Sequence, residues 1–97
     1  DSHNKKEMVY ELQNKLLEAM AMQIPCITST LANNALKAVN GKSILIADTP
    51  EQYAQHIISL LDNEQKAGDI GLNGYNYIHE NFSWEKETEK LEKLFLA

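Results

Sequence analysis

The sequence predicts an α/β fold in which a small parallel sheet is wound with helices and the carboxyl-terminal half is rich in helix. Two short apolar runs, at residues 25–30 and 43–48, have the composition of buried strands, and each follows a stretch with helical spacing. Strands that alternate with helices pair in parallel. Because a sheet of two strands is rarely a domain by itself, the pattern is typical of the last part of a larger α/β domain.

Length and composition exclude several classes of protein. The 97 residues form one domain at most, with a net charge of −5 and no arginine. Nucleic-acid binding needs a basic face, so we expect no nucleic-acid partner. No apolar run reaches the roughly 20 residues of a membrane span, and the polar start is not a signal peptide. The single Cys26 cannot form an internal disulfide, which indicates a cytoplasmic protein.

The first predicted helix covers residues 4–22, which hold no glycine or proline. Apolar residues recur there at every fourth position, as in an amphipathic helix: Met8, Leu12, Leu16 and Met20. Two starting points fit the pattern. Asn4, with Glu7 three residues later, forms a capping box, whereas Asn14 can cap a shorter helix that follows an extended segment. Propensity favours the long helix.

The middle of the chain predicts a strand, a short helix and a second strand. Pro25 ends the first helix, because the residue before a proline is pushed to extended geometry. The strand at 25–30 is followed by weak helical spacing over residues 31–39, and Gly41 fits a terminating position. The second strand covers residues 43–48.

The strongest start signal of the chain opens the next helix. Thr49 can act as its cap, Pro50 sits at the first helical position, and Gln52 completes a capping box. The helix is predicted to run to Asp62. Its apolar face consists of Tyr53, Ile57, Leu60 and Leu61.

Two further helices are predicted after this one. Asn63 can cap a helix that runs to about Glu80, and Ser83 can cap a final one. The first of them has glycines at a spacing of three, which favours close approach of two helices: Gly68, Gly71 and Gly74. The apolar stripe of the last helix consists of Trp84, Leu91, Leu94 and Phe95.

One segment resembles the retaining glycosyltransferases of group 1, also called family 4, which have two facing Rossmann-like domains. In that family a glycine-bearing loop precedes a helix that reads leucine-glutamate-alanine-methionine-alanine, and a proline and a strand follow. Here the helix motif is residues 17–21, and Pro25 and its strand follow in register. Three further segments match in order: 41–48, 49–61 and the turn at 81–84.

The resemblance, which covers residues 12–97, implies that the single domain 1–97 is a partial Rossmann-like sheet. It is identified as the carboxyl-terminal segment of a nucleotide-sugar donor-binding domain. Since the family has a loop before a short helix, the resemblance favours a helix that starts at Asn14. Tyr10 stands where the family commonly has a first glutamate, and the glycines of the loop are absent here.

The resemblance also assigns donor contacts. The residues expected to contact the donor are Gln13, Asn14, Lys15, Glu18, Thr28 and Ser29. Glu18 would bind the ribose hydroxyls, because a carboxylate accepts from two neighbouring donors. The helix start at 13–15 would face the diphosphate, and Thr28 and Ser29 would lie at the carboxyl ends of the strands. Plainer interpretations remain open: Glu18 and Lys15 as solvated helix residues, and Asn14 as a helix cap.

The implied activity is transfer of a sugar from a UDP- or GDP-sugar to an acceptor hydroxyl, in polysaccharide or glycoconjugate synthesis. No catalytic residue, metal or other cofactor is expected in this segment, which would be inactive without the amino-terminal domain of the enzyme. Two alternatives stand beside this interpretation. One is a non-catalytic interaction fragment that forms a homodimer, and the other is a sugar-nucleotide epimerase of the same fold.

Overall fold

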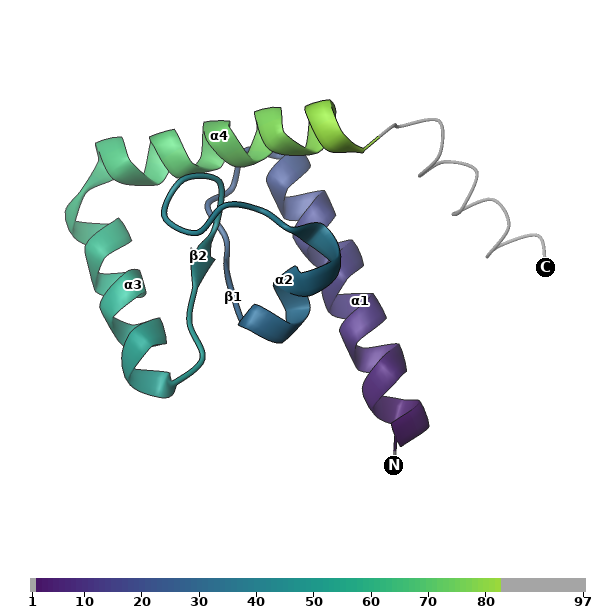
Figure 1. Cartoon of the computed structure of the whole chain (residues 1–97). Helices are drawn as coiled ribbons and strands as arrows, with labels where there is room; N and C mark the ends of the chain where they lie inside the picture. The colour runs from purple at the N-terminus through teal and green to yellow at the C-terminus, as the bar shows by residue number, and fades with distance from the viewer. Residues whose placement is uncertain (1, 83–97) are drawn as a thin grey trace.

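The computed structural model describes the backbone of residues 2–82 and the side chains of residues 11–82 (Figure 1). The elements are α1 (Ser2–Ala21), β1 (Ile27–Thr28), α2 (Thr30–Leu36), β2 (Leu45–Ile46), α3 (Pro50–Asp62) and α4 (Glu64–Asn81). β1 and β2 pair in parallel, which confirms the expected α/β class with a small sheet and a helix-rich second half. The expected final helix, with Trp84 and its stripe, lies outside the described residues.

The strands occupy the centre of the molecule (Figure 1). α1 and α2 lie on one side of them, α3 lies on the other, and α4 crosses the end at which the strands begin. The core gathers side chains from α1, α2, β2 and α4, with Cys26 just before β1, around Met20 and Ile44, the largest fully buried side chains. α1 packs against both α2 and α4.

α1 is one unbroken helix, so the expected helix start at Asn14 is wrong and the long helix is confirmed, although it begins at Ser2 and not at a cap at Asn4. The helix does not last until Pro25. It ends at Ala21, and Gln23 takes a left-handed conformation with φ 62°. The N–H of Ile24 donates to the carbonyl of Ala19 at 3.0 Å, and that of Gln23 donates to Met20 at 3.0 Å. This bonding pattern is a Schellman motif, which satisfies the last carbonyls of the helix.

α2 also ends earlier than expected, and Gly41 does not terminate it. The helix stops at Leu36, and Lys37 is the left-handed residue, with φ 54°. The side chain of Asn33 brackets the chain beyond it, because its Nδ2 donates to the Ala38 carbonyl at 2.9 Å and its Oδ1 accepts from the Ala38 N–H at 3.1 Å. Gly41, at φ 82°, belongs to the turn that leads into β2.

The two edges of the sheet differ. On the outer edge of β2, the N–H of Ile46 donates to Oδ1 of Asn40 at 3.0 Å, and its carbonyl lies 2.9 Å from Nε2 of His56. On β1, the parallel register turns the N–H and C=O of Ile27 away from β2. No described residue bonds to these two groups. Side chains therefore satisfy the outward backbone groups of β2, whereas those of β1 have no partner among the described residues.

The caps of the last two described helices agree with expectation. Oγ1 of Thr49 accepts from the N–H of Gln52 at 3.2 Å, with Pro50 in the first turn of α3. Oδ1 of Asn63 accepts from Lys66 at 3.0 Å and caps α4. The capping box differs in one bond, because Oε1 of Gln52 accepts from the N–H of Asp48 rather than from Thr49.

Two of the three glycines of α4 lie where the chain crosses closely. A Cβ atom built at Gly71 would lie 2.2 Å from the carbonyl oxygen of Gln23, and one at Gly74 would lie 3.0 Å from that of Ser43. A Cβ at Gly68 would meet nothing within 4 Å. Close approach is thus confirmed at Gly71 and Gly74, where the absence of a side chain lets α4 rest on the end of α1 and on the turn before β2.

Candidate functional site

The carboxyl ends of β1 and β2 are tied together by Asp48. The backbone N–H of Thr30 donates to Oδ1 of Asp48 at 2.8 Å, and the Thr30 hydroxyl donates to Oδ2 at 2.6 Å. These two hydrogen bonds, first from the hydroxyl and then from the amide, hold the pKa of the exposed Asp48 carboxyl below its ordinary value. A carboxylate from the end of β2 therefore sits against the first residue of α2.

Thr28 and Ser29, which were expected to contact a ligand at this corner, have other roles in the fold. Thr28 is buried, and Oγ of Ser29 accepts from the N–H of Ala32 at 3.1 Å as the cap of α2. A donor diphosphate at this corner would also meet the negative charge of Asp48. Asp48 was not among the expected site residues, although an acidic residue directly after a strand is a signal for the carboxyl edge of a sheet.

The four expected site residues on α1 do not all face the same way. Met20 marks the buried side of the helix, at 1% exposure. Successive residues are about 100° apart, so Glu18 lies about 160° and Lys15 about 140° from Met20. Both are exposed, whereas Gln13 and Asn14 are half-buried. Lys15 and Glu18 thus project from the outer face of α1, and no described contact joins them to Thr28 or Ser29.

Glu18 is nevertheless open to a ligand. Its carboxylate has no hydrogen-bond partner among the described residues. α1 runs opposite to β1 (Figure 1), and helical side chains tilt towards the amino terminus of their helix, so Glu18 leans towards the carboxyl ends of the strands. Lys15 lies three residues before it, one turn closer to that end. A cation and a carboxylate therefore lie one turn apart on the exposed face of α1, and no described residue pairs with the carboxylate.

No group of three or more histidine, cysteine, aspartate or glutamate side chains in the described part of the chain could hold a metal ion. Within residues 2–82, no helix combines the length and the apolar character that crossing a bilayer requires. Burial raises the pKa of the Cys26 thiol, which lies in the core.

Comparison with known proteins gives one family and several relatives. The sequence profile described as "Glycosyl transferases group 1" matches residues 5–63. The chain is 31% identical over 86 residues to an uncharacterised glycosyltransferase of Methanocaldococcus jannaschii, covering 87% of this chain and 22% of that protein. It is 32% identical to spore coat protein SA of Bacillus subtilis, over 80% of this chain and 22% of that protein.

A third relative is a capsular polysaccharide biosynthesis glycosyltransferase of Staphylococcus aureus, at 29% identity over 84% of this chain and 22% of that protein. The chain therefore spans about a fifth of the length of these relatives. No solved structure matches it. The matched region 5–63 contains α1 from residue 5 onward, both strands, α2 and α3, and so includes all of the expected site residues.

Proposed function

The chain belongs to the group 1 glycosyltransferases, and on this premise we propose that it forms part of the donor-binding domain of a sugar transferase. The donor would be a UDP- or GDP-sugar, and the sugar would pass to an acceptor hydroxyl. The S. aureus relative, named for capsular polysaccharide biosynthesis, supports a role in polysaccharide or glycoconjugate assembly. The observation that carries the proposal is that Glu18, within the matched region, is exposed and has no hydrogen-bond partner among the described residues.

Glu18 would bind the ribose of the nucleotide. An ionised carboxylate only accepts hydrogen bonds, and its two oxygens suit the two neighbouring ribose hydroxyls. Lys15, one turn away on the same outer face, would supply a positive charge for the diphosphate. The amides of residues 13–15 lie inside α1 and are not free to bind phosphate. In this proposal the positive charge of Lys15 therefore binds the diphosphate instead of the amides of a helix amino terminus.

The remaining parts of the reaction would come from the rest of the polypeptide. Acceptor binding and stabilisation of the leaving diphosphate depend on positioning by groups from both domains, so we expect residues 1–97 alone to be inactive. We also assign the protein to the cytoplasm, because Cys26 is a free thiol in the core and a reducing compartment preserves free thiols.

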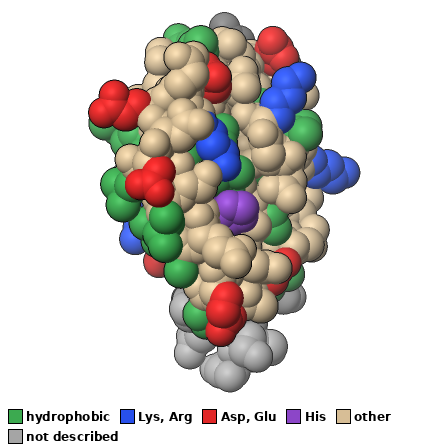
Figure 2. Space-filling model, turned by 90° about the vertical axis from the view of Figure 1, so that its left-hand side faces the viewer, with side chains coloured by type: hydrophobic (Ala, Val, Ile, Leu, Met, Phe, Trp, Pro, Cys, Tyr) green, Lys and Arg blue, Asp and Glu red, His purple; other side chains and the backbone are tan. Residues whose placement is uncertain are grey.

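A second candidate function, as an interaction fragment that forms a homodimer, is favoured by α3. None of the residues of this helix is buried, and Ile57, Ile58 and Leu61 are 48%, 58% and 78% exposed. Figure 2 shows hydrophobic side chains gathered at the surface on the side that carries α3. Exposed apolar stripes of this kind mark association surfaces. Light scattering that finds only monomer at high protein concentration would remove this candidate.

The donor role is tested by an amide NMR titration of the chain with UDP and with GDP. We expect shifts at residues 13–18, centred on Lys15 and Glu18, with the stronger response identifying the base. Thr28 and Ser29 should shift less, because Thr28 is buried and the Ser29 hydroxyl already accepts from the N–H of Ala32. An absence of shifts at millimolar nucleotide would contradict the proposal.

A further inference from the structure

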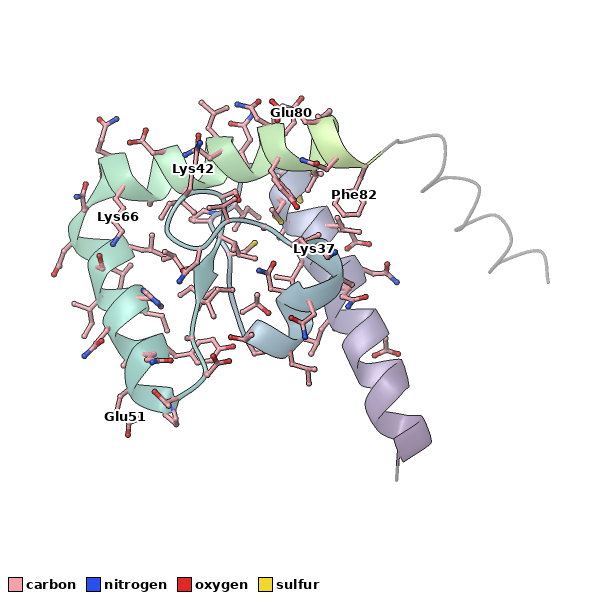
Figure 3. All side chains as sticks on the ribbon, viewed as in Figure 1. Lys37, Lys42, Glu51, Lys66, Glu80 and Phe82 are labelled. Atoms are coloured by element: carbon pink, nitrogen blue, oxygen red, sulfur yellow. The ribbon has the colours of Figure 1, made fainter. Side chains whose placement is uncertain are left out.

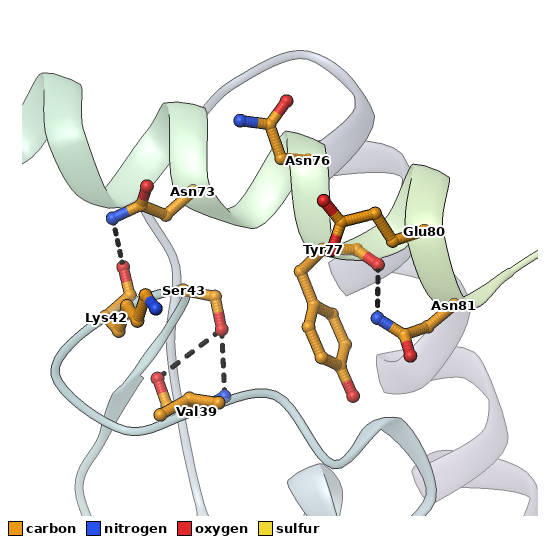
Figure 4. Close-up of a pocket in the computed structure, with 8 residues that line it drawn as sticks. All are labelled: Val39, Lys42, Ser43, Asn73, Asn76, Tyr77, Glu80 and Asn81. Atoms are coloured by element: carbon orange, nitrogen blue, oxygen red, sulfur yellow. Dashed lines mark hydrogen bonds between the residues drawn. The ribbon is translucent and has the colours of Figure 1, made fainter.

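A pocket of about 400 Å³ lies between α4 and the loop that joins α2 to β2, at the end of the sheet opposite to Asp48 (Figure 4). α4 supplies one wall, from residues at helical spacing: Asn73, Asn76, Tyr77, Glu80 and Asn81. The loop supplies the other wall: Val39, Lys42 and Ser43. Most of these side chains are polar, which distinguishes the pocket from the apolar clefts that bind most small molecules.

Two asparagines in this pocket are held so that their carbonyl oxygens stay available. Nδ2 of Asn73 donates to the Lys42 carbonyl at 3.1 Å, and Nδ2 of Asn81 donates to the Tyr77 carbonyl at 2.8 Å (Figure 4). Fixing the nitrogen of an amide also fixes its oxygen, which can accept two hydrogen bonds. Asn73 and Asn81 thus present oriented acceptors that no described residue uses.

Three more polar groups at the pocket have no described partner: the Lys42 ammonium, the Asn76 amide and the Glu80 carboxylate. Lys42 extends from the loop and Glu80 from α4, at different positions along the helix, and they do not form an ion pair with each other (Figure 3). The Glu80 carboxylate adds two acceptor oxygens to those of the asparagines. The pocket is therefore rich in acceptors, with Asn76 and Lys42 as its free donors.

Tyr77 gives the pocket an apolar wall of fixed orientation. Its hydroxyl oxygen lies 2.6 Å from the carbonyl oxygens of both Leu36 and Lys37, which share its single proton as acceptors. The ring also lies near Phe82, with centroids 6.5 Å apart. Anchored at the hydroxyl, the ring faces the pocket beside Val39, and a flat carbon surface of this kind can pack against the C–H face of a sugar ring.

We propose that this pocket binds a neutral saccharide. A saccharide is rich in hydroxyl donors, which suit the oxygens of Asn73, Asn81 and Glu80, and its own oxygens can accept from Asn76 and Lys42. An anion is a poorer match, because Glu80 would repel it. The proposal goes beyond the donor role and does not depend on it, since the pocket and the outer face of α1 share no residue.

The test is an NMR titration of the chain with maltotriose and with the linear trimer of N-acetylglucosamine. The side-chain amide signals of Asn73, Asn76 and Asn81 should shift with at least one of the two trimers. Asn76→Ala should weaken that binding about tenfold, the effect of a lost hydrogen-bonding pair. Asn34→Ala, which removes an exposed asparagine of α2 outside the pocket, should leave the dissociation constant unchanged.

The outcomes separate this proposal from the donor role. Shifts by neither trimer would overturn the saccharide site, and so would equal shifts by inorganic phosphate, which would indicate an anion held by Lys42. UDP and GDP report on residues 13–18 in the same spectra. The nucleotide site and the saccharide site can therefore fail independently.

Discussion

α3 and α4 follow each other in the chain and begin with equally clear caps, yet they are attached to the molecule in different ways. α4 buries Ile70, Gly71, Gly74 and Ile78 against α1 and the strand region. α3 buries no residue and is attached mainly through hydrogen bonds, from His56 to β2 and from Lys66 of α4 to Ser59 at 2.6 Å. A start signal thus fixes where a helix begins, but packing decides how much the helix contributes to stability.

Among the substitutions that add atoms, the largest effect should come from Gly71→Ala. The added Cβ would lie 2.2 Å from the carbonyl oxygen of Gln23, a backbone atom of the turn that ends α1, so the two segments must separate. We expect a loss of about 3 kcal/mol in the free energy of unfolding, at the upper end for overpacking. Urea denaturation measures it.

Gly68→Ala is the matched control for this change, since it adds the same methyl group to the same helix where nothing lies within 4 Å. It should stabilise the chain by about 0.5–1 kcal/mol through helix propensity alone. Equal effects of the two substitutions would show that α4 does not rest on α1 as the structure describes.

A smaller effect is expected from Tyr77→Phe, which removes the hydroxyl that joins α4 to the carbonyls of Leu36 and Lys37. The loss should be about 1 kcal/mol, the usual contribution of a hydrogen bond. Tyr75→Phe, on the same helix, provides a control. If the two variants were equally stable in thermal and urea denaturation, the Tyr77 hydroxyl would contribute nothing to the free energy of unfolding.

The two hydrogen bonds from Thr30 to the Asp48 carboxylate should make the free energy of unfolding depend on pH in the acid range. Its pKa is lower in the folded protein than in the unfolded chain, so its contribution is present above the ordinary aspartate pKa of about 3.9 and is lost as the pH falls through the folded value. In Asp48→Asn this component of the pH dependence should vanish. Urea denaturation midpoints at a series of pH values from neutral to acid measure this component. An unchanged acid dependence in the variant would argue against a stabilising contact between Thr30 and Asp48.

The smallest effect is expected on α3. Leu61 is 78% exposed, so Leu61→Ala should change the free energy of unfolding by less than about 0.5 kcal/mol. Ile78→Ala, the corresponding truncation on the buried face of α4, should cost about 2–5 kcal/mol. A large loss for Leu61→Ala under dilute conditions would mean that α3 is covered in solution, as the homodimer requires.

How much the sequence predicts depends on the range of the interaction. The starts of α3 and α4 were correct because Thr49 and Asn63 act on amides three residues away. The predicted end of α2 was wrong because glycine is the usual left-handed residue after a helix, which pointed to Gly41. In the structure the non-glycine Lys37 takes that conformation, and the Asn33 side chain bonds to the chain beyond it. The equally spaced Gly68 and Gly71 look alike in sequence, and only the position of α1 distinguishes them.

The site shows the same division. The exposure of Glu18 and Lys15 follows from the spacing of the α1 stripe. The pairing of Thr30 with Asp48 joins residues 18 positions apart. The backbone N–H and C=O of Ile46 bond to the side chains of Asn40, earlier in the chain, and His56, later in the chain. The first contact depends on how the two strands pair, and the other two depend on where a turn and α3 place their side chains, so none of them follows from the pattern of one element.

The most direct test of the donor role is the dissociation constant for UDP and GDP of three proteins: the unaltered chain, Glu18→Ala and Glu11→Ala. Glu11 lies two turns before Glu18 on the same exposed face of α1, so the two variants change charge and helix propensity alike. We predict that Glu18→Ala weakens nucleotide binding at least about tenfold, as loss of a charged hydrogen-bonding partner should, while Glu11→Ala stays within about twofold. Equal effects of the two substitutions would reduce Glu18 to a solvated carboxylate and contradict the proposed ribose contact.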